Sequence, residues 1–255
     1  SPRIASGFLG RFLFLALCIL LWAGCLLPMG CSSEKADTPT DLRFSGETMG
    51  TYYHVTVSHF PSSVAPEKIA QQVEDALESV NRKMSTYKED SELTQFNLHT
   101  STDPFPVGAD TAAVFRIARQ VSEASGGAFD ITVGPLVNLW GFGPEKRSED
   151  PAPEVIQKTL DRIGWDKVTI GGDDTLSKKI PDIYCDLSAV AKGYGVDKAA
   201  AALDDLGVSD YMIEVGGEVR TRGKNAEGLP WRIGIEQPLD EAQAVQVVTG
   251  LSDVS

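Results

Sequence analysis

Hydrophobic side chains recur at helical spacing in several stretches of the chain. The pattern predicts helices over residues 66–84, 110–125, 153–163 and 189–206. Glycine, the residue that most often ends a helix, directly follows the last three of these stretches. In the second helix, Asp110 is the expected N-cap. The side chains expected to face inward in that helix are Val114, Ile117, Ala118 and Val121.

Alternating or short apolar runs predict strands in other parts of the chain. Residues 42–58 alternate β-forming and polar side chains and are interrupted at Met49-Gly50-Thr51, which predicts a strand or hairpin. A second hairpin is expected over residues 167–180. Further strands are predicted over residues 183–187, 211–215, 218–222, 231–236 and 245–248. Because strands and helices mix without a strict β-α-β rhythm, we expect an α+β fold.

The first 31 residues predict an export signal. Arg3 and Arg11 accompany an uncharged apolar run over residues 12–27, which is the order of a secretory signal. The run is short for a bilayer-spanning helix, and a polar segment follows it. A cleaved signal is therefore the first interpretation, and an uncleaved signal anchor is the alternative.

Cys31 is the predicted lipidation site. It follows Gly30 and precedes a polar stretch, residues 32–41, that would serve as a tether. A small residue followed by cysteine and a polar tether is typical of bacterial lipoproteins, in which lipid chains on the cysteine hold the protein at a membrane. Cys25 is the alternative, but the apolar residues that follow it make a poorer tether.

Composition and charge narrow the classes of function. The 255 residues are 42% hydrophobic and 23% charged, which is typical of a globular protein. The formal net charge is −13, and such a surface repels phosphate backbones, so we expect no nucleic-acid partner. The sequence lacks the glycine-rich phosphate loops and the Gly-x-Ser-x-Gly nucleophile turn. Cys185 lies in an apolar run and is expected to be buried packing, and the three histidines show no metal-ligand spacing.

One stretch suggests a phosphate site. A predicted strand ends at Asp186, a turn of small residues follows, and Lys192 lies in the first turns of the next helix. Backbone N–H groups at a helix start attract anions, and a lysine adds a full positive charge. Asp186 or a carbonyl in the turn could face Mg²⁺, which prefers oxygen ligands. The alternative is an ordinary capped helix with Lys192 in solvent.

Two other glycine-rich stretches are weaker candidates. Gly216-Gly217 stands between Glu214 and Glu218, where a ligand could approach the backbone closely, or where the chain could simply form a hairpin turn. In residues 125–135, Phe129 could stack on a ring and Asp130 could accept a hydrogen bond from a ligand. The alternative there is a helix end, a turn and a strand, with Phe129 in the core.

Several short segments become specific when they are taken together and in order. They are Met49-Gly50-Thr51, MSTY at 84–87, SEL at 91–93 with FN at 96–97, GGAFDITVGPL at 126–136, WGFG at 140–143, DLSAVAKG at 186–193, EVGGE at 214–218 and PWRIGI at 230–235. With the lipoprotein-like leader, this ordered set resembles the ApbE family of FAD:protein FMN transferases over about residues 42–240.

The resemblance implies a flavin transferase domain over residues 42–255, with mixed sheets and flanking helices. It implies that FAD and Mg²⁺ bind, and that the FMN half of FAD moves to a threonine hydroxyl of a partner protein while AMP is released. The residues that the resemblance assigns to FAD are Met49, Tyr87, Ala128, Phe129, Asp130, Asp186 and Lys192, with Lys192 also catalytic. Gly216, Gly217 and Glu218 would shape the pocket, and the Ala189 backbone carbonyl would bind Mg²⁺.

The family pattern continues beyond Ser255, so we expect two further Mg²⁺ ligands and the base that takes the threonine proton to lie outside this sequence. The resemblance also implies a lipid-anchored protein on the periplasmic side of the bacterial inner membrane. Its partners would be flavoprotein subunits of membrane redox complexes. Two alternatives use the same site: a Mg²⁺-dependent FAD pyrophosphatase, and a non-catalytic, lipid-anchored flavin-binding protein.

Overall fold

The computed structural model describes residues 41–144, 149–237 and 245–253. The predicted signal segment (residues 1–31), including Cys31, and nearly all of the predicted tether (32–41) lie outside the described residues. All described residues belong to one structural unit of the chain, Pro39–Ser255. Within the described ranges, no helix is both long and apolar enough to cross a bilayer.

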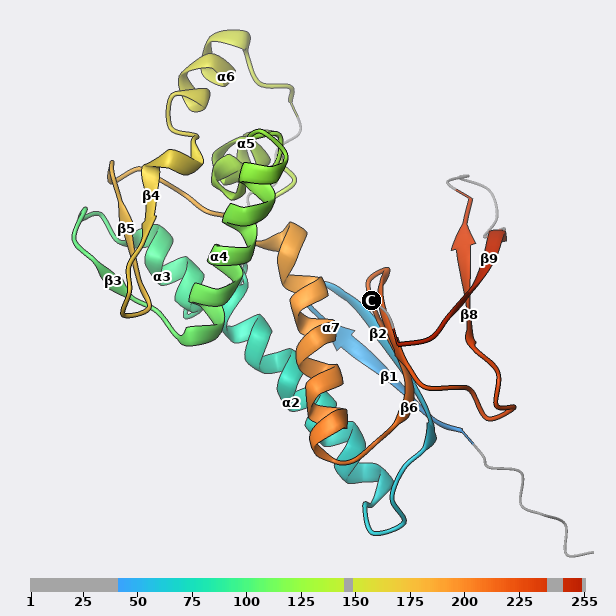
Figure 1. Ribbon diagram of the computed structural model, residues 1–255. Coiled ribbons are helices and arrows are strands. Elements are labelled where there is room, and N and C mark those ends of the chain that lie inside the picture. Colours follow the sequence, from blue (N-terminus) through green and yellow to red (C-terminus); the bar gives the residue numbers. More distant parts are fainter. Residues whose placement is uncertain (1–40, 145–148, 238–244, 254–255) are drawn as a thin grey trace, which may run out of the picture. The chain divides into compact units, whose positions relative to one another are not determined.

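A four-stranded antiparallel sheet in the order β1-β2-β6-β7 forms one layer of this unit (Figure 1). Alternate side chains of β2 and β6, such as Val55 and Ile213, are buried on one face, which is the pattern of a sheet covered on that side. Of the two possibilities predicted for residues 42–58, a strand or a hairpin, the structure shows the hairpin, formed by β1 and β2. The strands are β1 (Leu42–Thr48), β2 (Thr51–His59), β6 (Asp210–Val215) and β7 (Glu218–Arg222).

Two long helices pack side by side, α2 (Pro66–Met84) and α7 (Ser188–Asp205) (Figure 1). α2 occupies its predicted span, with proline in the first turn and an apolar face of buried residues, Ile69, Val73, Leu77, Val80 and Met84. α7 lies one residue earlier at each end than predicted, and small buried residues such as Gly195 and Ala199 allow close packing. The first hydrophobic core lies between these helices and strands β2 and β6.

A second hydrophobic core is built from the last turn of α2, helix α4 (Ala109–Ala124) and a small sheet in the order β3-β5-β4. The predicted hairpin over residues 167–180 is confirmed as the pair β4 and β5. The remaining elements are α3 (Glu92–Leu98), β3 (Phe105–Pro106), η1 (Ile131–Val133), α5 (Gly134–Leu139), α6 (Pro153–Leu160), η2 (Trp165–Lys167), β4 (Val168–Ile170), β5 (Thr175–Lys178), β8 (Trp231–Glu236) and β9 (Val245–Leu251).

The predicted strand over residues 183–187 is wrong, although its apolar side chains are buried as expected. The backbone of this segment is hydrogen-bonded to a side chain and to a loop carbonyl rather than to a neighbouring strand. The Asn97 side chain bonds both to the Cys185 amide and to the Cys185 carbonyl, each at 2.8 Å. The Asp186 amide donates to the Ile131 carbonyl at 2.7 Å. Side-chain and loop hydrogen bonds therefore take the place of a partner strand at Cys185 and Asp186.

Several predicted details of α4 and its surroundings are also wrong. The N-cap of α4 is Gly108, and the Asp110 carboxylate bonds to other helices instead. Ile117 and Val121 are exposed rather than inward. The strand expected near residue 131 is the 3-10 turn η1, because the Asp130 side chain caps it. α6 ends at Leu160, three residues short of the prediction.

Candidate functional site

Two tight hairpin turns lie at the same end of the four-stranded sheet. One consists of Met49 and Gly50, between β1 and β2, and the other of Gly216 and Gly217, between β6 and β7. The turns are neighbours because β2 and β6 pair, with Tyr53 opposite Val215. All four turn residues have positive φ, which is rare for methionine, at +50° for Met49. The turn geometry thus fixes Met49 in an uncommon backbone conformation.

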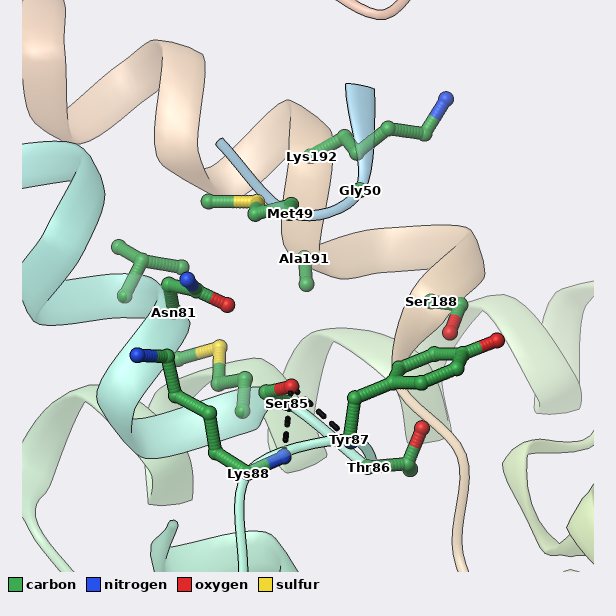
Figure 2. Close-up of a pocket in the computed structure, with 12 residues that line it drawn as sticks. Met49, Gly50, Asn81, Ser85, Thr86, Tyr87, Lys88, Ser188, Ala191 and Lys192 are labelled. Atoms are coloured by element: carbon green, nitrogen blue, oxygen red, sulfur yellow. Dashed lines mark hydrogen bonds between the residues drawn. The ribbon is translucent and has the colours of Figure 1, made fainter. Parts of the chain in front are cut away.

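Next to the Met49 turn lies a cavity of about 410 Å³, a size typical of small-molecule sites (Figure 2). One wall comes from the end of α2 and the loop after it, and the opposite wall from the start of α7. The side chains mix apolar and polar character, as ligand pockets do. The lining residues are Met49, Gly50, Val80, Asn81, Met84, Ser85, Thr86, Tyr87, Lys88, Ser188, Ala191 and Lys192.

Ser85 organises the loop that follows α2. Its hydroxyl accepts hydrogen bonds from the amides of Tyr87 and Lys88, at 3.0 and 3.3 Å (Figure 2). Its carbonyl accepts from the hydroxyls of Ser91, at 2.5 Å, and Thr94, at 3.1 Å. Ser91 in turn caps α3, so this short helix is joined to the cavity wall. Ser85 therefore holds the loop through both its side-chain hydroxyl and its backbone carbonyl.

Tyr87 projects from this loop toward Ser188, and the residue is 63% exposed (Figure 2). The phenol hydroxyl donates to the Phe142 carbonyl at 3.4 Å. Trp140 and Phe142, in the segment WGFG at 140–143, are also exposed. An exposed aromatic ring fixed at the edge of a cavity offers a flat face for a planar ligand.

Lys192 lines the cavity, but its side chain extends past Gly50 rather than toward Ser85 (Figure 2). Its ammonium group donates to the Gly216 carbonyl at 3.0 Å and lies 3.3 Å from Glu218 Oε1. A β-carbon at Gly216 would stand 2.7 Å from Thr51 Cγ2 and 3.2 Å from Lys192 Cδ, so glycine leaves room for both neighbours at this turn. The alternative that Lys192 points freely into solvent is therefore wrong. Three predicted residues, Lys192, Gly216 and Glu218, meet at this turn.

The start of α7 presents backbone groups. Its N-cap, Leu187, provides no side-chain hydrogen bond, and Asp186 Oδ1 accepts from the Ser188 amide at 2.7 Å instead. Ser188 and Ala189 are exposed. Among the residues that the structure describes, no three His, Cys, Asp or Glu side chains gather as a metal site. The described part of the chain thus offers only scattered oxygen atoms to a divalent cation.

Four of the seven residues assigned to FAD, Ala128, Phe129, Asp130 and Asp186, do not line this cavity. The other predicted site residues, Ala189, Gly216, Gly217 and Glu218, do not line it either. Ala128 is exposed, and Phe129 packs partly buried against the second core. Asp130 Oδ1 accepts from the amide and the hydroxyl of Thr132, at 2.8 and 2.7 Å. Asp130 Oδ2 accepts from the Trp165 amide at 2.9 Å. In this structure the Asp130 carboxylate holds two loop segments together.

The cavity contains residues that sequence reasoning did not assign to the site. Asn81, Ser85, Thr86, Lys88 and Ser188 are the polar ones among them. Ser85 and Thr86 lie in the segment MSTY at 84–87, so the resemblance could have pointed to them as site residues. The sequence gives less reason to assign Asn81 and Lys88 to a site, since polar residues at a helix end are ordinarily solvated.

The cysteine and two of the histidines considered in the sequence lie outside the cavity. Cys185 is fully buried, as expected, and burial raises the pKa of its thiol well above the usual range, which makes it a poor nucleophile. His54 is exposed on β2, and its Nδ1 lies 2.9 Å from Glu214 Oε2. His59 Nδ1 lies 3.7 Å from Asp210 Oδ2. Neither histidine contributes to the cavity.

Comparison with known proteins adds an independent line of argument. The model of the ApbE family matches residues 49–254. A relative from Haemophilus influenzae, named FAD:protein FMN transferase, is 47% identical over 220 residues, which are 84% of this chain and 64% of the relative. A relative of the same name from Vibrio cholerae is 43% identical over 227 residues, 89% of this chain and 66% of the relative. The chain therefore spans just under two thirds of the length of these relatives.

Solved structures of flavin transferases are similar to this chain in fold as well as in sequence. The flavin transferase ApbE from Vibrio cholerae superposes with a TM-score of 0.79 at 43% identity, covering 84% of this chain and 69% of that structure. The apo flavinyl transferase ApbE from Pseudomonas stutzeri gives 0.75 at 33% identity, covering 84% of this chain and 68% of that one. The α+β fold expected from the sequence is confirmed.

Proposed function

The chain belongs to the ApbE family, and from this membership we propose that it moves the FMN half of FAD onto a threonine hydroxyl of a partner protein. The observation that carries the proposal is the cavity of about 410 Å³ bounded by Met49, Tyr87 and Lys192, three residues that the family pattern assigns to FAD. A planar ring, an apolar wall and a cation at one cavity suit a ligand that joins a flavin to a pyrophosphate.

The proposed reaction is a phosphoryl-type transfer. The threonine oxygen forms a bond to the phosphorus of the FMN half, and the bond from that phosphorus to the bridging oxygen breaks. AMP leaves with the bridging oxygen, and the hydroxyl proton passes to a base. Catalysis of such a step depends on positioning and on charge stabilisation more than on covalent chemistry by the protein.

Lys192 is the side chain proposed to stabilise negative charge on the transferred phosphate. Its partner Glu218 is half exposed, and exposed ion pairs contribute only about 0–1 kcal/mol. A pyrophosphate can therefore compete with Glu218 for the ammonium group. The Gly216 carbonyl keeps Lys192 near the turn while the charge partner changes.

Mg²⁺ is part of the proposal, because a bound divalent cation would offset charge on the pyrophosphate. The described residues do not complete a site for it: the Ala189 carbonyl and the Asp186 carboxylate are the proposed contributors. Mg²⁺ is commonly held by one or two carboxylates together with substrate phosphates, so FAD itself would supply part of the ligand set. Removal of Mg²⁺ by a chelator is expected to stop transfer.

The test uses the complete gene product, FAD, Mg²⁺ and a candidate acceptor domain, with mass spectrometry of every product. A covalent FMN adduct on a threonine, with AMP, supports the proposal. Free FMN with AMP would mean a pyrophosphatase, and FAD binding without AMP would mean a non-catalytic carrier. The variant Lys192→Ala should lower the transfer rate on the order of 10²–10³-fold, as for other single charge stabilisers. Lys179→Ala, an exposed lysine outside the cavity lining, is the control.

We also propose that the protein is lipid-anchored at Cys31, on the periplasmic side of the bacterial inner membrane, and that its acceptors are flavoprotein subunits of membrane redox complexes. The leader and the polar tether support this assignment. Cys31→Ala should move the protein from the membrane fraction to the soluble fraction, whereas Cys25→Ala should not. The opposite result would assign the lipid to Cys25.

A further inference from the structure

One carboxylate joins three helices beside the cavity. Asp110, in the first turn of α4, accepts hydrogen bonds from Lys83 of α2 at 2.6 Å and from the Tyr194 hydroxyl of α7 at 2.7 Å. Lys198, one turn further along α7, lies 3.3 Å from the same carboxylate. α4 itself contacts both α2 and α7 (Figure 1). We call Asp110, Lys83, Tyr194 and Lys198 the helix clamp.

The donors of the clamp stand directly beside cavity residues. Lys83 immediately precedes Met84, which lines one wall. Tyr194 follows Lys192, which lines the opposite wall, by two positions in the same helix. Asp110 does not line the cavity, yet it is bonded to the elements that form both walls. The clamp therefore links the two elements that form the walls.

The clamp is partly shielded from water, with side-chain exposures of 22% for Asp110 and 28% for Lys83. Burial alone would raise the pKa of Asp110, but hydrogen bonds from Lys83, Tyr194 and Lys198 lower it to about 2. Burial and the bond to Asp110 raise the pKa of Tyr194, so its hydroxyl remains a donor at neutral pH. At neutral pH the Asp110 carboxylate is thus ionised and the Tyr194 hydroxyl keeps its proton, so the hydrogen bond between them is retained.

We propose that Asp110 is a positioning residue that sets the distance between the α2 and α7 walls and thereby the affinity for FAD. The inference rests on the proposed function and adds to it a residue that acts only through others. Ligand affinity depends on how closely the free protein matches its bound geometry, so a loosened wall weakens binding without removing any ligand contact.

A second ion pair on the same helix provides a matched control. Arg116 of α4 bonds Asp174, in the turn between β4 and β5, at 2.7 Å. This pair ties α4 to the small sheet, and neither residue lines the cavity. Asp174→Asn therefore removes a charge from a comparable pair on α4 and leaves both walls tied together.

The experiment compares Asp110→Asn, Tyr194→Phe and Asp174→Asn in the complete gene product. FAD binding is measured by calorimetry, and amide hydrogen exchange is measured in residues 81–88 and 188–194. We expect exchange to rise in both segments and the Kd for FAD to rise about 3–10-fold in the two clamp variants, a range typical of indirect coupling. Asp174→Asn should change neither by more than about twofold.

The possible outcomes separate the two proposals. Unchanged exchange in Asp110→Asn, or raised exchange with an unchanged Kd for FAD, would overturn the clamp as a positioning device. An equal effect of Asp174→Asn would also overturn it, because the effect would then be general destabilisation. If the wild-type protein does not bind FAD, the proposed function fails together with the flavin role, while the exchange result still decides whether Asp110 holds the walls. Lys83→Arg, which keeps the charge pair, should retain wild-type FAD affinity.

Discussion

The Met49 side chain occupies the space that a side chain at position 195 would need. A β-carbon on Gly195 would stand 2.8 Å from Met49 Cε and 3.4 Å from Leu77 Cδ2. Met49 also contacts both hydrophobic cores and lines the cavity. The absence of a side chain at this position of α7 therefore leaves room for the Met49 side chain beside the cavity.

We expect Gly195→Ala to lower the affinity for FAD more than it lowers stability. The new methyl group displaces Met49, but the end of a methionine side chain moves easily, and alanine gains about 1 kcal/mol of helix propensity over glycine. The free energy of unfolding should thus change by less than about 1 kcal/mol, while the Kd for FAD rises several-fold. Denaturant unfolding and calorimetric titration with FAD check the two quantities.

Gly193→Ala is the control, since a β-carbon at Gly193 in the same helix meets nothing within 4 Å. It should stabilise the protein by about 0.5–1 kcal/mol and leave Met49 in place. A stability loss of several kcal/mol in Gly195→Ala would show that Met49 cannot move and that the explanation is incorrect.

The Ser85 hydroxyl is expected to control FAD binding through Tyr87. Ser85→Ala removes the acceptor of two loop amides at a cost of about 1 kcal/mol, and it frees the loop that carries the aromatic ring. The Kd for FAD should rise several-fold, and Ser85→Thr, which keeps the hydroxyl, should restore most of the affinity. Titration of FAD against the protein, followed by flavin fluorescence, measures the change.

A similar turn elsewhere provides the comparison for Ser85. The Ser101 hydroxyl accepts from the Asp103 amide at 3.0 Å in an exposed loop. Ser101→Ala should leave FAD affinity unchanged. An affinity of Ser85→Ala equal to that of the wild type would show that the loop needs no hydroxyl to hold Tyr87.

The elements that the sequence predicts well are those whose signal is local. The apolar spacing from Ile69 to Met84, with Pro66 at the start, predicts α2 to the residue, since periodicity and capping both act within one helix. Glycine pairs mark the turn at Gly216 in the same local way. The strand prediction for residues 183–187 is wrong for the opposite reason. The apolar composition of the segment shows that it is buried, but its hydrogen-bond partner, Asn97, lies 88 positions away from Cys185 and leaves no local signal.

Prediction of the candidate site is likewise limited to what local sequence segments show. Ordered segments point to Met49, Tyr87 and Lys192, and the structure brings these three to one cavity. Local reasoning assigns Asp110 to the cap of its own helix, but long-range packing offers it stronger partners on two other helices. Capping propensity is worth about 1 kcal/mol, so charged donors from other elements outweigh it easily.

Lys178 is expected to stabilise the fold although it is a buried lysine. Its ammonium group donates to the carbonyls of Asn97 at 2.9 Å, His99 at 2.8 Å and Pro181 at 3.4 Å, and lies 5.0 Å from the centre of the Phe96 ring. Burial lowers the pKa of Lys178. In Lys178→Met these carbonyls lose their donor, so the free energy of unfolding should fall by about 1–3 kcal/mol.

The neighbouring residue is the control for Lys178. Lys179 is exposed and lies 3.6 Å from Asp166, so Lys179→Met should change the free energy of unfolding by less than about 0.5 kcal/mol. Urea unfolding monitored by circular dichroism measures both variants. Equal stability of the two would mean that apolar packing replaces the bonds of Lys178 in full.

The helix clamp predicts a specific loss of stability in acid. The pKa of Asp110 is lowered to about 2 in the folded protein, from 3.8 in the unfolded chain, so between these pH values the unfolded chain binds more protons. The contribution is therefore complete above about pH 4 and disappears as the pH falls toward 2, at a total of about 2 kcal/mol. Asp110→Asn lacks this titration. The difference in unfolding free energy between the wild type and this variant should therefore shrink by about 2 kcal/mol between pH 5 and pH 2. Urea unfolding of both proteins from pH 5 to pH 2 measures it, and because all other carboxylates are common to the two chains, a difference that stays constant with pH would show that Asp110 does not titrate as the clamp requires.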